Sequence, residues 1–246
     1  MNKVAKITFN FWIMKICATT LGETAGDLLS MTMNVGYAMS SGILVSIFFI
    51  TLIMQLTSRK FNPVLYWTVI LSTSTAGTTM SDFMDRTLKF GYAKGSVILI
   101  TCLLGTLAVW YFSEKTLSVS NIQTTKAEIF YWIAILFSNT LGTALGDFLA
   151  DNSGLGFLGG AALIAGLIGV AVFTWYFTRS NRVILFWIIF VLTRPFGATF
   201  GDLLTKPVAK GGLNFGTIGS SSILAAILII FVVYTSIAEK KAVAES

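Results

Sequence analysis

The sequence predicts an all-α polytopic membrane protein with eight transmembrane helices. Hydrophobic residues make up 55% of the 246 residues, charged residues make up 11%, and the mean hydropathy is +0.80. An ordinary soluble domain carries about 25% charged residues. A segment that begins with a Trp and ends with an Asp also occurs four times. An internal repeat of this kind determines how the rest of the chain must be organised.

The four copies of this segment align without gaps. They occupy residues 12–27, 67–82, 132–147 and 187–202. Each copy also carries a glycine ten residues after its Trp, namely Gly22, Gly77, Gly142 and Gly197. Matches at three fixed positions in four copies indicate one structural unit used four times.

Each copy lies in the first of two apolar spans. The predicted spans are 8–31, 37–57, 63–84, 93–112, 128–149, 157–178, 183–204 and 217–237. A run of about 20 apolar residues is long enough to cross a bilayer as a helix. We call the first span of each pair the motif helix and the second its partner helix.

The whole chain, residues 1–246, is predicted to form a single transmembrane domain. Its repeats cover 8–57, 63–112, 128–178 and 183–237, and a polar stretch at 113–128 separates the halves 1–120 and 121–246. Because each repeat has an even number of spans, all four should point the same way through the membrane. The sequence therefore predicts four parallel two-helix repeats arranged as two pseudo-symmetric halves.

The first apolar run is not interpreted as a cleavable signal, because Lys15 interrupts it and the same segment recurs inside the chain. Basic residues are more frequent on the side that holds both termini. Ten lie there: Lys3, Lys6, Arg59, Lys60, Lys115, Lys126, Arg179, Arg182, Lys240 and Lys241. Five lie on the other side: Arg86, Lys89, Lys94, Lys206 and Lys210. This asymmetry predicts cytoplasmic termini and places the four repeat Trp residues in the cytoplasmic interface belt. The net charge of +6 needs no nucleic acid partner to explain it.

Each motif helix is predicted to have one polar face. The positions seven, eight, eleven, twelve and fifteen residues after the Trp fall on one side of a helix. They hold, among others, Thr19, Ser74, Asn139 and Arg194 at seven, and Glu23, Thr78 and Thr143 at eleven. In a bilayer such a face must look toward protein or water. The glycines ten and fourteen residues after the Trp form small-xxx-small patterns, which are typical of close helix packing.

The four aspartates at position fifteen are the leading candidates for a functional site. Asp27, Asp82, Asp147 and Asp202 are joined by Glu23, one turn before Asp27. Parallel repeats would bring these acids toward a shared axis, where they repel one another unless protons or cations neutralise them. The alternative is that single aspartates cap a neighbouring helix or pair with Arg86 or Lys206.

The available donors indicate a hard cation. The chain has no His, and its two cysteines, Cys17 and Cys102, are isolated. Carboxylate, hydroxyl and amide oxygens suit Mg²⁺, Ca²⁺, Mn²⁺ or protons. Neutral oxygens for such a site are expected from Thr20, Thr24, Thr75, Thr79, Asn139, Thr140 and Thr199. Threonines in membrane helices also bond back to their own helix, and this alternative stays open. A softer metal at Met31, Met33 and Met39 is a weaker alternative, because methionine usually serves packing.

Two cations within the motif helices support a second hypothesis. Arg194 and Lys15 would bind a small anion, helped by a helix break at Pro195 that exposes backbone N–H groups. They would otherwise neutralise the aspartates or extend toward the interface. Acidic residues beyond the motif, Asp85 and Asp151, are candidates for an outer vestibule. A third hypothesis is a membrane scaffold without transport activity. An enzyme is not expected, because the chain has no His, no nucleophile elbow and no phosphate loop.

With its Trp residues at 12, 67, 132 and 187, the chain resembles a bacterial membrane protein family built from four copies of a two-helix repeat of unknown function. The resemblance covers essentially the whole chain and implies a bacterial inner membrane. Glu23-Thr-Ala-Gly26-Asp27 is also loosely similar to the Glu-x-Gly-Asp signature of a group of cation exporters, with one extra residue.

Taken together, these features predict a transporter, and more specifically an exporter, of a divalent metal cation, with Mn²⁺ the favoured ion. Glu23, Asp27, Asp82, Asp147 and Asp202 would bind the ion or exchange protons. The transported ion is the substrate, and no cofactor is expected. The lipid bilayer is the other expected partner, and a homo-oligomer is left open.

Overall fold

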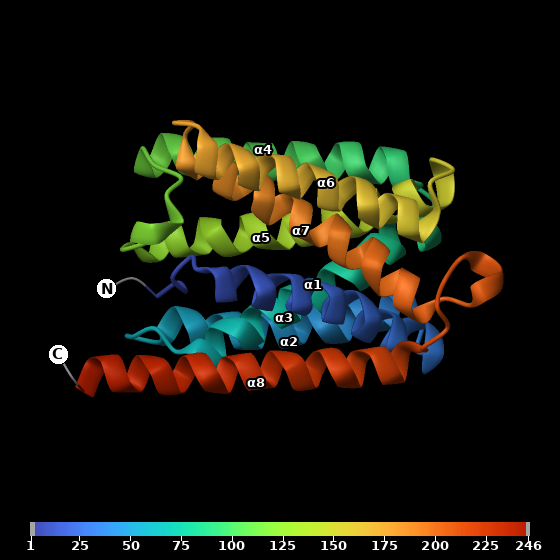
Figure 1. Ribbon diagram of the computed structural model, residues 1–246, viewed down its shortest axis with the longest axis horizontal. Coiled ribbons are helices and arrows are strands. Elements are labelled where there is room, and N and C mark those ends of the chain that lie inside the picture. Colours follow the sequence, from blue (N-terminus) through green and yellow to red (C-terminus); the bar gives the residue numbers. More distant parts are fainter. Residues whose placement is uncertain (1–2, 245–246) are drawn as a thin grey trace.

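The computed structural model describes residues 3–244, with side chains for residues 3–120 and 122–238. Within this range the chain forms eight α-helices and no strand (Figure 1). The helices are α1 (Phe9–Asp27), α2 (Tyr37–Thr57), α3 (Pro63–Asp82), α4 (Tyr92–Glu114), α5 (Thr125–Asp147), α6 (Gly156–Phe177), α7 (Arg182–Thr205) and α8 (Thr217–Ala244). They run roughly along one common axis, and both chain ends lie at the same end of the bundle. We call this the terminal end and the opposite one the loop end.

The observed helices match the predicted spans closely, with two differences. Helix α5 begins at Thr125 because Thr124 caps it, so the polar stretch between the halves is shorter than 113–128. A 3₁₀ turn at Val119–Asn121 and the buried side chain of Ile122 anchor what remains. Helix α8 continues to Ala244, beyond the predicted end at residue 237.

The four motif helices form an inner ring. Helix α1 packs against α3 and α7, and α5 packs against the same two helices. Each partner helix lies outside this ring on the motif helix that follows it, so that α2 packs on α3, α4 on α5, α6 on α7 and α8 on α1. The polar segments of the chain are therefore central and the apolar ones peripheral.

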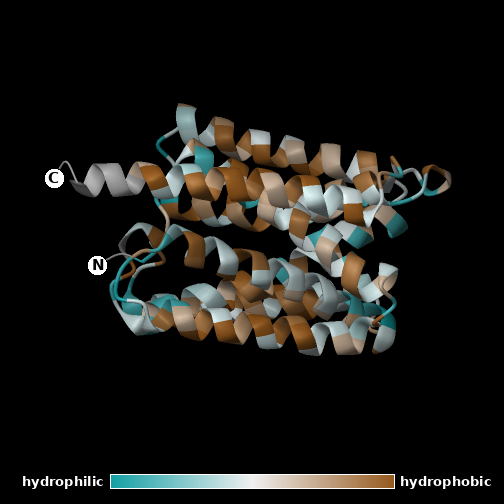
Figure 2. Cartoon of the chain, turned by 90° about the horizontal axis from the view of Figure 1, so that it is seen from below, coloured by the Kyte–Doolittle hydropathy of each residue, from teal (hydrophilic) through white to brown (hydrophobic). Residues whose placement is uncertain are grey.

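Six of the eight helices are long and apolar enough to cross a membrane, within the described residues. These six are α2, α4, α5, α6, α7 and α8. Figure 2 shows hydrophobic residues along the outer helices and hydrophilic residues gathered in the loops at both ends. Helices α1 and α3 fall outside the six because their threonines, serines and acids lower the hydropathy. Since other helices surround them, they can carry these residues without exposing them to lipid.

Polar side chains cap the start of each inner helix. Thr8, Asn62, Thr124 and Asn181 each accept a hydrogen bond from a backbone N–H in the first turn. Pro63 occupies the first turn of α3, where its missing N–H costs nothing. These caps fix where the four inner helices begin at the terminal end.

At the loop end, three of the four motif aspartates stand at a change of helix type. Asp27, Asp82 and Asp147 are each the last α-helical residue before a π-helical turn of five residues. In the fourth repeat α7 instead continues past Asp202 to Thr205. Such π turns widen the backbone spacing and are often found at functional sites.

The repeat Trp residues do not form an interface belt, which corrects the prediction. The side chains of Trp67, Trp132 and Trp187 are buried, and Trp12 is half-buried. They lie inside the terminal end in a continuous aromatic cluster, for example Tyr66 against Trp132 with ring centroids 5.6 Å apart. The indole side chains are enclosed because the outer helices cover the motif helices that carry them. The cluster closes the terminal end of the bundle with apolar packing.

Candidate functional site

The inner helices approach one another through the repeat glycines. The glycine ten residues after each Trp faces the residue seven after the next Trp: Gly22 faces Ser74, Gly77 faces Asn139, Gly142 faces Arg194 and Gly197 faces Thr19. A Cβ added at Gly22 would lie 2.9 Å from the carbonyl carbon of Ser74, so these backbones nearly touch. The glycines therefore serve close helix packing, as the small-xxx-small pattern predicts.

The same register shows that the inner helices run in one direction. One turn beyond these contacts, Gly26 faces Thr78, Gly146 faces Ala198 and Gly201 faces Glu23. Both members of each pair have advanced by four residues, which requires parallel helices at the α1–α3, α5–α7 and α7–α1 interfaces. The last of these interfaces joins the fourth repeat to the first and closes the ring.

Polar side chains fill the interior of the ring in successive layers. The residues seven, eleven and fifteen after each Trp are buried in every repeat: Thr19, Ser74, Asn139 and Arg194; Glu23, Thr78, Thr143 and Ala198; Asp27, Asp82, Asp147 and Asp202. Positions seven, eleven and fifteen of the predicted polar face thus point inward, whereas Thr24 and Thr199 at position twelve lie against the outer helices α8 and α6. The inward-pointing positions bring the five candidate acids toward the loop end of a shared interior.

Arg194 lies at the centre of the first of these layers and is fully buried. Its Nη1 donates to Oε2 of Glu23 at 3.1 Å, and its Nη2 donates to the hydroxyls of Thr78 and Thr143 at 2.5 and 2.6 Å. The same Glu23 oxygen accepts from both threonines at 3.3 Å. One guanidinium therefore joins residues of α1, α3, α5 and α7.

The structure corrects two expectations about the buried cations. Pro195 lies within a continuous α7 and does not break it. Lys15 neither reaches the interface nor pairs with an aspartate. Its ammonium is buried, 3.5 Å from Oδ1 of Asn139 and 4.1 Å from the ring centroid of Phe190. Arg194 neutralises Glu23 and none of the four aspartates.

The aspartates are held in two pairs by cations at the loop end. Nε of Arg86 lies 2.9 Å from Oδ1 of Asp82, one turn earlier in the chain, and its Nη2 lies 3.0 Å from Oδ2 of Asp147. The guanidinium also sits beside the rings of Tyr37 and Tyr92. This first bridge joins α3 to α5.

Lys206 forms the second bridge in the same way. Its Nζ lies 3.0 Å from Oδ1 of Asp202, one turn earlier, and 2.5 Å from Oδ2 of Asp27 on α1. Burial by itself lowers the pKa of Lys206, but the carboxylates of Asp202 and Asp27 raise it above the ordinary value for lysine. The ammonium therefore stays charged between the two acids.

Three acids converge on one point despite these pairings. One ligand oxygen from each of Glu23, Asp147 and Asp202 lies within 4.8 Å of the other two. Oδ1 of Asp27 and Oδ2 of Asp82 are buried and have neither a hydrogen bond nor an ion pair among the described residues. The acids are thus clustered, and some of their oxygens have no partner.

Most of the residues predicted to supply neutral oxygens to the metal site do not lie with the acids. Threonine hydroxyls eight and twelve residues after the Trp donate to carbonyls of their own helices, as seen for Thr20, Thr24, Thr75, Thr79, Thr140 and Thr199. Thr24 also accepts from Ser221 of α8, and the Thr199 methyl lies near Gly160 of α6. Several of these residues therefore lie toward the outer helices. Asn139 is central and donates to Thr73 at 2.9 Å.

Thr78 and Thr143 belong to the interior more clearly than the threonines selected from the sequence. Both stand eleven residues after the Trp, the position that Glu23 occupies in the first repeat. Their shared position in the repeat could have identified them as hydrogen-bond partners of the Glu23–Arg194 pair. The bridging roles of Arg86 and Lys206 follow from a second register, because each stands nineteen residues after its Trp.

The remaining candidate residues lie outside the cluster. Asp85 is buried against Gly95 of α4 and does not line an open vestibule, which corrects that expectation. Asp151 is exposed and accepts a hydrogen bond from Tyr92. Cys17 and Cys102 are both free thiols. Met33 and Met39 are exposed, whereas the sulfur of Met31 lies 3.8 Å from Nζ of Lys206.

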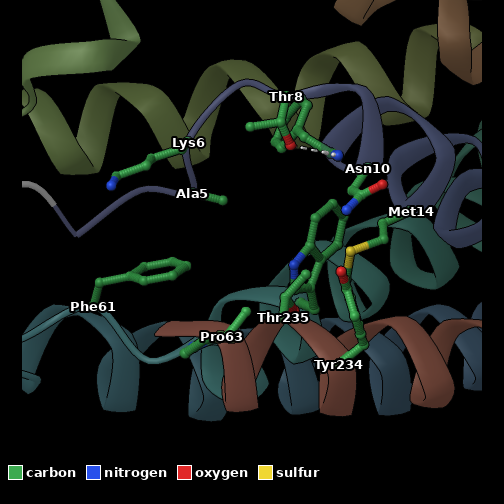
Figure 3. Close-up of a pocket in the computed structure, with 12 residues that line it drawn as sticks. Ala5, Lys6, Thr8, Asn10, Met14, Phe61, Pro63, Tyr234 and Thr235 are labelled. Atoms are coloured by element: carbon green, nitrogen blue, oxygen red, sulfur yellow. Dashed lines mark hydrogen bonds between the residues drawn. The ribbon is translucent and has the colours of Figure 1, made fainter. Parts of the chain in front are cut away.

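A separate pocket of about 250 Å³ opens at the terminal end (Figure 3). It lies between the N-terminal segment, the start of α3 and the end of α8, and Lys6, Phe61, Pro63 and Tyr234 are among its lining residues. No acid lines it. Because the carboxylate cluster is at the opposite end of α1, the pocket does not belong to the candidate cation site.

The fold and the site define a class of protein: an all-α protein with membrane-like outer helices around a parallel inner ring whose interior is polar. The chain belongs to the family described as Repeat of Unknown Function (DUF347), whose model matches it four times, at residues 10–61, 65–116, 130–181 and 185–241. A search of curated proteins and a search of solved structures found no match.

Proposed function

We propose that this protein is a transporter that exports a divalent metal cation, with Mn²⁺ as the favoured substrate. The carboxylates of Glu23, Asp27, Asp82, Asp147 and Asp202 would carry the ion and exchange it for protons. The convergence of Glu23, Asp147 and Asp202 on one point supports this proposal most directly.

The proposed setting is a bacterial inner membrane crossed by all eight helices, with both termini in the cytoplasm. Four parallel two-helix repeats would form two pseudo-symmetric halves. Helices α1 and α3 have 19 and 20 residues, close to the length of about 20 that a bilayer requires. They lie inside the ring, so they can span the bilayer without being strongly apolar. The excess of basic residues at the terminal end supports the orientation.

The spacing of the acids suits a hard cation. Ligand oxygens bind Mg²⁺ at about 2.0–2.1 Å and Ca²⁺ at about 2.3–2.6 Å, so oxygens on opposite sides of such an ion lie about 4–5 Å apart. The ligand oxygens of Glu23, Asp147 and Asp202 all lie within 4.8 Å of one another, which is close enough for one such ion to contact all three. The hydroxyls of Thr78 and Thr143 lie beside Glu23, one turn nearer the terminal end than the aspartates. They would supply neutral oxygens to the ion.

The charge balance also favours a cation. Five acids share three nearby cations, Arg86, Arg194 and Lys206, among the described residues. When all five acids are ionised the cluster carries an excess of negative charge. Such an excess is costly within a membrane unless protons or a metal ion neutralise it.

Two other functions remain as weaker proposals. Transport of a small anion would use Arg194 and Lys15, and the absence of a carboxylate beside Lys15 favours it. However, the donors of Arg194 at Nη1 and Nη2 already bind Glu23, Thr78 and Thr143. The third function is a scaffold without transport activity. The buried carboxylate oxygens that have no partner among the described residues argue against it, because a scaffold has no use for them.

The proposal is tested by flux measurements in proteoliposomes. Wild-type protein should move Mn²⁺ across the bilayer, and Asp27→Asn and Asp147→Asn should each reduce this flux at least tenfold. Unchanged Mn²⁺ flux in both variants would rule out the proposed site. Anion flux that is lost in Arg194→Glu, with no metal flux in the wild type, would instead support the second function.

A further inference from the structure

Each of the two bridges at the loop end crosses a boundary between the sequence halves. Arg86 joins α3 of the first half to α5 of the second, and Lys206 joins α7 of the second half to α1 of the first. The interfaces within each half, α1–α3 and α5–α7, carry no such ion pair among the described side chains. The bridges therefore connect the two halves with each other.

The repeat register shows that the two bridges are one device used twice. Arg86 and Lys206 occupy the position nineteen residues after the Trp in repeats two and four, where repeats one and three carry Met31 and Asp151. In both bridges the cation binds the aspartate of its own helix and the aspartate of the next motif helix in the ring. Alternate repeats thus supply the cation for two acids.

The bridging cations are placed so that they can leave. The side chain of Arg86 is 32% exposed and that of Lys206 is 21% exposed, whereas that of Arg194 is 0% exposed. Both are long side chains at the loop end, where an alternative position in solvent is within reach. Arg194 has no such alternative and is fixed by its buried partners.

The acids they hold are incompletely satisfied. Oδ1 of Asp27 and Oδ2 of Asp82 have no partner among the described residues. Solvent does not reach them either, because each side chain is at most 2% exposed. A buried carboxylate oxygen without a partner is costly. These two oxygens are therefore poised to accept a further positive charge.

We propose that Arg86 and Lys206 are built-in competitors of the transported cation, which takes over the aspartates that they hold. This inference rests on the proposed function. One divalent ion carries the same charge as the two departing side chains, so the exchange does not increase the negative excess of the buried cluster, which protons neutralise. That equality matters in a membrane, where an uncompensated charge is expensive.

The exchange also links ion binding to movement of the halves. When Arg86 and Lys206 leave, the ion pairs Arg86–Asp147 and Lys206–Asp27 are lost at the loop end. The Arg194–Glu23 pair, one turn further inside, still joins α7 to α1. At the terminal end the halves stay connected by the hydroxyls of Tyr66 and Tyr131, 2.6 Å apart, and by Lys3 with Glu128 at 2.6 Å. Binding of the cation would thus weaken the contact between the halves at the loop end and leave their contact at the terminal end intact.

The inference is tested by titrating Mn²⁺ into the purified full-length protein in detergent and measuring its dissociation constant. Arg86→Gln and Lys206→Gln each remove one competitor and should bind Mn²⁺ about tenfold more tightly than the wild type. The matched controls are Lys89→Gln and Lys210→Gln, which remove exposed basic side chains at the same end that form no ion pair. Their affinity should change by less than about twofold.

A milder variant keeps the test decisive if a glutamine variant does not fold. Arg86→Lys retains the charge but loses the two-nitrogen bridge from Nε and Nη2, and should bind Mn²⁺ between two- and fivefold more tightly. Equal or weaker binding in the bridge variants, with normal binding in the wild type, overturns the competition and leaves the proposed function intact. No Mn²⁺ binding in any variant or in the wild type overturns both.

Discussion

Nη1 of Arg194 lies 3.1 Å from Oε2 of Glu23, and neither side chain is more than 3% exposed. This pair stands at the centre of the inner ring and binds all four motif helices through Thr78, Thr143 and backbone oxygens. Removing one partner leaves a buried charge without compensation, which typically costs about 3–5 kcal/mol. We therefore expect Arg194→Met to lower the free energy of unfolding by about that amount, measured by denaturant titration in detergent micelles.

The double variant Glu23→Gln/Arg194→Met separates the cost of an unpaired charge from the loss of packing. Because it removes both charges together, it should be more stable than Arg194→Met alone. A double variant that is less stable than both single variants would show that the pair contributes through shape and hydrogen bonds more than through charge.

The repeat glycines offer a second stability test. A Cβ at Gly22 would press on the backbone of Ser74, so Gly22→Ala should destabilise the bundle by about 1–3 kcal/mol through overpacking. Gly105→Ala is the matched control, because Gly105 lies within α4 and has open space around it. It should leave stability unchanged or raise it slightly. Equal losses in both variants would contradict close packing at the α1–α3 interface.

Much of the fold could be predicted from the sequence because the four repeats place equivalent residues at equivalent positions of four helices. The Trp-to-Asp spacing places all four aspartates at the same depth of parallel helices, and the glycine positions mark the contact surfaces. The fate of the Trp residues could not be predicted in this way. Hydropathy alone does not distinguish an aromatic ring at a lipid interface from one enclosed by outer helices, as Trp132 is.

The acids of the site and their possible basic partners, Arg86 and Lys206, were predictable, but not which two aspartates each partner joins. The aspartates recur at one position, so their convergence follows from the register. The pairing of Asp147 with Arg86 is not visible in that register, because it depends on which helix is the next one around the ring. The threonines have the same limit, since a difference of one residue decides whether a hydroxyl faces the interior, as in Thr143, or an outer helix, as in Thr24.

The boundary between the halves can be tested at the terminal end. The hydroxyls of Tyr66 and Tyr131 lie 2.6 Å apart and are fully buried, so each is the partner of the other. Tyr66→Phe or Tyr131→Phe leaves one buried hydroxyl unsatisfied and should cost about 1–3 kcal/mol of unfolding free energy. The double variant should recover part of that loss. Strictly additive losses in the double-mutant cycle would show that the two hydroxyls do not depend on each other.

The donor set of the candidate site predicts which metal ions are transported. Carboxylate and hydroxyl oxygens favour hard ions, and neither thiolate nor imidazole lies among the converging acids. Proteoliposomes should therefore move Mn²⁺ and exclude Cu⁺, measured as flux of each ion under the same gradient. Asp202→Asn should abolish Mn²⁺ flux, because it removes one of the three converging carboxylates. Asp151→Asn is the matched control, since Asp151 is exposed at the same end and should be dispensable. Copper flux that equals manganese flux, or a loss of flux in Asp151→Asn as large as in Asp202→Asn, would place the ion path somewhere other than the carboxylate cluster.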